Sequence, residues 1–159
     1  MMNEAAGKQS SGNKRFGLTK MQWGLIVGIV FAAIGSYVGT QLASGNFGSA
    51  TSIDKQLLAM TNEINKSCPL VMDQDTRLDN TSAGPGRMIT YNYTLVNLSI
   101  ENINVDEFRD YIQPRVINNA RTSDDMKYFR ENEVTLRYKY SDKNGNFVFD
   151  VKVTPEDYK

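Results

Sequence analysis

Few residues in this 159-residue chain could do chemistry, because it contains no histidine and a single cysteine, Cys68. Without histidine there is no Ser-His or Cys-His nucleophile pair, and the most frequent general base and metal ligand are missing. A single cysteine forms no disulfide within the chain and no thiolate metal cluster. Its position before Pro69 leaves two roles open: a buried small apolar residue, which we favour, or a disulfide between two chains.

Aspartates are the remaining candidates, and four charged residues alternate along one stretch of the chain. If this stretch is a strand, one of its faces carries all four: Asp73, Asp75, Arg77 and Asp79. The stretch lacks the glycine that a calcium-binding EF-hand loop needs, because Leu78 stands at that position. Arg77 can pair with the carboxylates around it, so the sequence favours a solvated, ion-paired sheet face. The alternative is an acidic patch that binds a partner.

A second segment, residues 142–146 (DKNGN), looks at first like a cation-binding loop. Alternating apolar residues flank it on both sides, so Asn144-Gly145 predicts the turn of a β-hairpin instead. No glycine-rich phosphate loop is present. The chain beyond residue 20 holds 14 basic and 17 acidic side chains, a balance that disfavours nucleic-acid binding. We therefore expect no enzyme activity, no metal, no cofactor and no small-molecule substrate.

A long uncharged stretch near the N-terminus predicts a membrane span. No residue between positions 20 and 54 is charged, and residues 23–42 are mostly apolar. As a helix those 20 residues measure about 30 Å, the thickness of a bilayer core. We expect a transmembrane helix over residues 21–43 after a basic cytoplasmic tail, residues 1–20, with the remainder in the periplasm. The alternative is a cleaved signal peptide that releases a secreted or periplasmic ligand-binding domain.

The same stretch carries a stripe of small side chains. They recur every three or four residues and so share one helix face: Gly24, Gly28, Ala32, Gly35, Gly39 and Ala43. Small residues let helix backbones approach closely in lipid, where little hydrophobic drive exists between helices. The stripe predicts packing of this helix against itself or against a partner helix.

After the span, residues 44–52 (SGNFGSATS) form a short flexible linker, and residues 53–159 have the length of one compact domain. The domain is expected to begin with a helix that runs from a cap at Thr51 or Ser52 to about residue 66. Its apolar face is formed by residues at helical spacing: Ile53, Leu57, Met60 and Ile64.

Two strands are expected next, over residues 70–78 and 88–96, with a turn at residues 82–86 between them. In the first strand, the acidic stretch faces away from Leu70, Met72 and Leu78. The second strand alternates clearly, and one of its faces is apolar: Ile89, Tyr91, Tyr93 and Leu95.

A second helix is expected from Asn104, which forms a plausible capping box with Glu107. Its apolar face consists of Val105, Phe108, Ile112 and Val116. Pro114 lies inside this pattern and is expected to kink or divide the helix. Ser123 can cap a further short helical turn that carries Met126 and Phe129.

The chain closes with a predicted hairpin around Asn144-Gly145. Its two arms alternate over residues 134–140 and 147–153. A two-residue loop places four pairs of residues opposite each other: Tyr140 and Phe149, Tyr138 and Val151, Leu136 and Val153, and Lys139 and Asp150.

Together these elements predict an α+β domain with a four-stranded antiparallel sheet, made of two hairpins, packed against two or three helices. One core is expected to join the covered face of the sheet to the helices, and its members are Ile89, Tyr91, Tyr93, Tyr138, Phe149, Val151, Leu57, Ile64, Phe108 and Ile112. The order of the strands in the sheet does not follow from the pattern.

Three stretches of the domain look like small single-span bacterial envelope proteins of no assigned activity: KSCPLVMDQDTRLDN, ITYNYTLVN and YKYSDKNGNFVFDV. The resemblance implies a bacterial inner membrane and assigns no catalytic residue. We therefore interpret the chain as an inner-membrane protein whose periplasmic domain binds a partner, as an accessory or scaffold subunit of an envelope assembly.

Overall fold

The structure, a computed structural model of the chain, describes residues 52–159. The predicted tail (1–20), the predicted transmembrane helix (21–43) with its stripe of small residues, and the linker up to residue 51 lie outside the described residues. No helix within the described part is long and apolar enough to cross a membrane.

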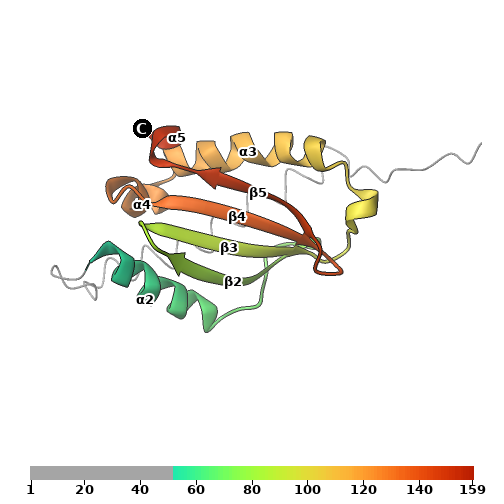
Figure 1. Ribbon diagram of the computed structural model, residues 1–159, viewed down its shortest axis with the longest axis horizontal. Helices are drawn as coiled ribbons and strands as arrows, with labels where there is room; N and C mark the ends of the chain where they lie inside the picture. The colour runs from blue at the N-terminus through green and yellow to red at the C-terminus, as the bar shows by residue number, and fades with distance from the viewer. Residues whose placement is uncertain (1–51) are drawn as a thin grey trace, which may run out of the picture.

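Five strands form one sheet in the order in which they occur along the chain. Figure 1 shows β2, β3, β4 and β5 side by side in this order. The strands are β1 (Leu70–Val71), β2 (Thr76–Gly84), β3 (Met88–Leu95), β4 (Thr135–Asp142) and β5 (Phe147–Val153). The helices are α2 (Ile53–Asn65), α3 (Val105–Thr122), α4 (Lys127–Glu131) and α5 (Pro155–Tyr158), with short 3-10 turns at Ile100–Asn102 and Asp124–Met126. Helix α2 lies along the β2 side of the sheet and α3 along the β5 side.

The predicted four-stranded antiparallel sheet is wrong, because the sheet has five strands and is mixed. Strands β3 and β4 run parallel, with Tyr91 beside Tyr138 and Tyr93 beside Tyr140. Parallel neighbours need a long crossover connection, and α3 and the short helices after it supply it. The two predicted hairpins therefore join through a β-α-β unit.

The single strand predicted over residues 70–78 is also wrong. The chain reverses between β1 and β2, so Leu70 pairs with Leu78 instead of extending toward it. Asp73 closes this turn: its Oδ1 accepts hydrogen bonds from the backbone N–H groups of Asp75 and Thr76, both at 2.8 Å. An aspartate that bonds the backbone two or three residues ahead favours a turn over a strand.

Strand β2 then continues to Gly84, through the first half of the predicted turn. The chain turns at residues 85–87, where Gly86 and Arg87 have positive φ values of 74° and 56°. The backbone N–H of Arg87 donates to Asp54 Oδ1 at 2.8 Å, which attaches this turn to the start of α2.

Helix α3 begins where predicted, and the side chain of Asn104 accepts a hydrogen bond from Glu107 N at 3.3 Å, which is one of the two bonds of the predicted capping box. Pro114 does not divide it, and the helix runs for 18 residues. Proline removes the N–H that would reach the backbone oxygen of Asp110, but both residues lie on the exposed side, where water can bond that oxygen. Across the turn that contains Pro114, the Arg115 guanidinium lies 3.5 Å from the centre of the Tyr111 ring.

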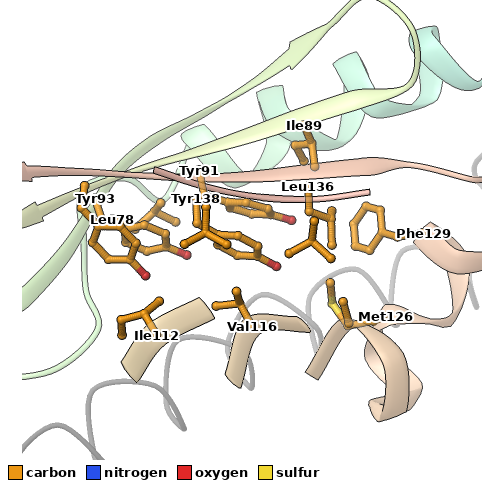
Figure 2. Packing of buried hydrophobic residues seen from close by; sticks show 14 of the residues in the cluster. Leu78, Ile89, Tyr91, Tyr93, Ile112, Val116, Met126, Phe129, Leu136 and Tyr138 are labelled. Carbon is orange, nitrogen blue, oxygen red and sulfur yellow. The ribbon is translucent and has the colours of Figure 1, made fainter. Parts of the chain in front are cut away.

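One hydrophobic core joins the covered face of the sheet to α2 and α3, and all ten residues predicted for it are buried. Aromatic rings form its centre. Tyr91 stacks on Tyr138 at 5.4 Å between ring centroids, and Tyr93 stacks on Tyr140 at 5.2 Å. Figure 2 shows Ile112 and Val116 facing these rings from α3. Phe108 meets both Tyr140 and Phe149 edge-on, at 5.9 and 5.1 Å.

The terminal hairpin has the predicted register in all four pairs, from Tyr140 opposite Phe149 to Leu136 opposite Val153. A two-residue loop would pair Ser141 with Val148, but Ser141 pairs with Phe147, so the loop is one residue longer than predicted. A β-bulge at Val148 compensates for the extra loop residue, so the predicted register resumes at Tyr140 and Phe149. Because of the bulge, Val148 and Phe149 are both buried. Phe147 is consequently turned outward and is 51% exposed.

Phe149 and Phe147 lie two residues apart on β5 and form a matched test of the core. Replacing Phe149 with alanine should lower the free energy of unfolding by about 3–5 kcal/mol, because the buried ring leaves a cavity. Replacing Phe147 with alanine should lower it by less than about 1 kcal/mol. Urea denaturation of the two variants measures the difference, and equal losses would contradict the assigned bulge.

Candidate functional site

The residues predicted to form a partner-binding patch do not share one surface. Asp73 and Asp75 belong to the turn before β2, whereas Arg77 and Asp79 lie on the uncovered face of β2. The Arg77 Nε donates to Asp79 Oδ1 at 2.5 Å, and Thr94 Oγ1 on β3 donates to the other carboxylate oxygen of Asp79, also at 2.5 Å. The predicted ion-paired sheet face is thus present, with only half of its predicted members.

Asp75 joins two loops of the described domain. It is 7% exposed, and its carboxylate accepts a hydrogen bond from Asn97 Nδ2 at 2.9 Å. Its backbone oxygen accepts from Val96 N at 2.9 Å. These bonds attach the turn between β1 and β2 to the loop that follows β3. Burial raises the pKa of the Asp73 carboxyl, although hydrogen bonds from Asp75 and Thr76 oppose this effect.

Asp142, the first residue of the segment 142–146, is the most buried carboxylate of the described domain, with 0% exposure. Its Oδ1 accepts from the N–H groups of Asn144 and Asn146, both at 2.8 Å, and its Oδ2 from Ile100 N at 3.1 Å. It therefore joins the β4–β5 turn to the loop before α3. The signal for this role was an aspartate at the start of an Asn-Gly turn, where its side chain can accept turn N–H groups.

The hydrogen bonds to Asp142 determine its charge state. Burial alone would raise the pKa of its carboxyl, but the donors from Ile100, Asn146 and Asn144 outweigh burial and lower the pKa to about 2. Asp142 is a structural anion and not a proton donor at neutral pH.

The inward-facing tyrosines have no exposed reactive group. Tyr91, Tyr93, Tyr138 and Tyr140 are each 1–4% exposed. Burial raises the pKa of all four hydroxyls. They are therefore protonated at physiological pH and out of reach of a substrate. Their role is to pack the core.

Cys68, the single cysteine, is free and half-buried beside the core. Burial, and to a smaller extent the charge of Asp79, raises the pKa of its thiol. A raised pKa leaves little thiolate, the reactive form. Within residues 52–159, no three His, Cys, Asp or Glu side chains are grouped so as to hold a metal ion.

The uncovered face of the sheet is the largest continuous feature that remains for function. The strand registers align five of its residues in one row across all the strands: Val71, Arg77, Thr94, Ser141 and Phe147. The two ends of this row are exposed apolar residues, and its middle is polar. Further rows on the same face carry Asn92, Lys139 and Asp150, and then Thr90, Arg137 and Lys152. We call this surface the outer face.

The outer face is suited to binding a macromolecule by polar contacts. Every outward residue of β3 and β4 keeps partial exposure, in strict alternation with the buried residues. Two shallow surface pockets lie elsewhere, at the start of α3 (210 Å³, lined by residues 101–105) and beside Pro114 on α3 (370 Å³). Each pocket is lined by a few residues of one short segment, whereas the outer face extends across all five strands, so the outer face is the stronger candidate.

Residues 52–149 match a protein family described as a domain of unknown function, DUF8479. The chain belongs to this family. No curated protein matches it in sequence. The description of the family assigns no activity, which agrees with the resemblance to proteins of no assigned activity.

Solved structures from bacteria share the fold of this DUF8479 domain. A candidate secreted protein from Pseudomonas aeruginosa is 12% identical, with a TM-score of 0.53 over 70% of this chain and 100% of that chain. The type II secretion system pilotin AspS from Vibrio cholerae is 10% identical, with a TM-score of 0.50 over 66% of this chain and 91% of that chain. The pilotin EpsS of the Vibrio vulnificus type 2 secretion system is 12% identical, with a TM-score of 0.50 over 67% of this chain and 96% of that chain. At these identities the likeness shows the fold alone.

The role of Asp142 predicts a specific dependence of stability on pH. Because its pKa in the folded chain, about 2, lies below the ordinary value of 3.8, its carboxylate stabilises the fold above about pH 4. That contribution is lost as the pH falls from about 4 to 2. Replacing Asp142 with asparagine should therefore lower the melting temperature most at neutral pH, and the gap to the wild type should narrow toward pH 2.

The control for this measurement is Asp110→Asn, a change of the same kind at an exposed position on α3. Its melting temperature should follow that of the wild type at every pH. If both variants lose the same stability at neutral pH, the assignment of Asp142 as a structural anion is wrong.

Proposed function

We propose that residues 52–159 form a protein-binding domain that serves as an accessory subunit of a bacterial envelope assembly. The observation that carries the proposal is the fold shared with two type II secretion pilotins, since the shared region covers 91% and 96% of those chains. Those proteins consist almost entirely of this fold. A fold alone does not fix a function, so the chemistry of the surface has to support the same conclusion.

The surface supports binding rather than catalysis. The hydroxyls of the four inward-facing tyrosines are buried and Asp142 is held as an anion within its turn, so none of these groups offers an acid or base to a substrate. The outer face instead combines exposed polar groups on a rigid sheet, which is the type of surface that a protein partner can cover. We propose that the domain is not an enzyme.

We place the domain in the cell envelope, outside the cytoplasmic membrane. The Pseudomonas aeruginosa neighbour is described as a candidate secreted protein, and the uncharged stretch between positions 20 and 54 has the character of an export signal. Of the two arrangements considered from the sequence, we propose the exported domain released by signal cleavage.

Fractionation of bacterial cells that carry a C-terminally tagged chain tests location and association together. The tag should be digested by protease added to spheroplasts, and the mature mass should fall below the 17.9 kDa of the full chain. In native extracts the tagged protein should migrate in a complex larger than its own mass. A tag protected until the membrane is lysed, or migration as a free monomer, would contradict the proposal.

A further inference from the structure

The half of the outer face formed by β4 and β5 carries excess positive charge. Its charged residues are Arg137 and Lys139 on β4, and Asp150 and Lys152 on β5. The register places Lys139 opposite Asp150, and Arg137 opposite Lys152. We call these four residues the cationic patch.

The single carboxylate of the cationic patch is already engaged. Arg137 Nε donates to Asp150 Oδ2 at 2.5 Å, diagonally across the two strands. Lys139 lies directly opposite Asp150 but forms no ion pair with it. Among the described residues, no carboxylate lies within ion-pair distance of Lys139 or Lys152. Two ammonium groups therefore remain available to a partner.

The charge of the cationic patch is opposite to that of the whole domain. The described residues hold 14 basic and 17 acidic side chains, whereas three of the four charged residues of the patch are basic. An acidic partner is repelled by the average surface and attracted here, and this contrast favours one docking position over others.

The edges of the sheet are less suited to binding a segment. Strand β1 pairs only with the start of β2, and Asn65 occupies the edge of β2 further along. The Asn65 side chain accepts a hydrogen bond from Thr81 N at 2.7 Å and donates one to Thr81 O at 2.8 Å. These two bonds take the place of an added strand. At the other edge, the irregularity at Val148 interrupts the regular spacing that an added strand would need.

We infer that the cationic patch binds an acidic segment of the partner protein in extended conformation; the inference rests on the proposed function. Lys139 on β4 and Lys152 on β5 are diagonal neighbours across the strand pair, so their side chains leave the sheet about 7–8 Å apart. Alternate carboxylates of an extended segment lie about 6.6–6.8 Å apart, which is close to this spacing. Such a segment can cross β4 and β5 with alternate carboxylates near Lys139 and Lys152, while Thr90 on β3 offers a hydroxyl on the far side of Arg137.

The test uses a fluorescein-labelled peptide of alternating glutamate and threonine, (Glu-Thr)₆, as the probe of the full chain. Fluorescence anisotropy should detect binding that weakens as salt is raised. Replacing Lys139 and Lys152 together with glutamate should weaken binding by at least about tenfold, because two attractions become repulsions. Both lysines lie on the solvent side of the sheet, so the variant should still melt cooperatively, with a small fall in melting temperature because K139E places a carboxylate opposite Asp150.

The matched control is Lys55→Glu with Lys127→Glu, which changes the net charge equally on the helices α2 and α4. It should keep the affinity within about twofold of the wild type. Equal losses in the two double variants, or no binding of (Glu-Thr)₆ by the wild type, would overturn the inference. A third outcome would also overturn the inference: the wild type does not bind the peptide, but it binds vesicles containing 30% phosphatidylglycerol in a way that requires Lys139 and Lys152.

The native complex separates this inference from the proposed function. If the K139E/K152E variant still migrates in the large envelope complex, the cationic patch is not its docking surface, and the inference fails while the proposed function stands. If the wild type forms no such complex, the proposed function fails first. Loss of the complex in K139E/K152E, together with its retention in K55E/K127E, supports both.

Discussion

The parallel pairing of β3 with β4 is the constraint on which the rest of the structure depends. It aligns Tyr91 with Tyr138 and Tyr93 with Tyr140, so that their rings stack in pairs within the core. A parallel pair needs a crossover, and α3 has to return across the same face that these rings fill. With α2 on that face too, the other side of the sheet stays uncovered. The open outer face is thus a consequence of the connection between two strands.

Local patterns predicted the elements well, because their information lies within a few residues. The alternation of β3, the apolar faces of α2 and α3, the Asn104 cap of α3, and the register of the terminal hairpin all followed from spacing. The prediction of a strand failed for the residues before β2. Their alternation is typical of a strand, but Asp73 accepts a hydrogen bond from the backbone N–H of Asp75 and closes a turn. How the hairpins join depends on contacts between residues far apart in sequence, so the parallel pair and the fifth strand had no local signal.

The candidate site was harder to predict than the fold. The sequence pointed to the acidic stretch, and the structure divides it: Asp73 and Asp75 hold loops, while Arg77 and Asp79 pair on the outer face. Lys139 on β4 and Lys152 on β5 have no distinctive spacing in the sequence. Whether they can bind a partner depends on which basic residue pairs with the Asp150 carboxylate. The sequence placed Lys139 opposite Asp150, but the ion pair goes to Arg137. Only the side-chain geometry reveals the two unpaired ammonium groups.

The central claim is that the outer face, and not the helical side, meets the partner. Site-specific photo-crosslinking in cells tests it most directly, with the crosslinking amino acid placed at Thr90 on the outer face or at Leu58, which is 52% exposed on α2. The account predicts a covalent adduct of discrete mass from Thr90 and none from Leu58. An adduct from Leu58 alone, or equal adducts from both positions, would contradict it.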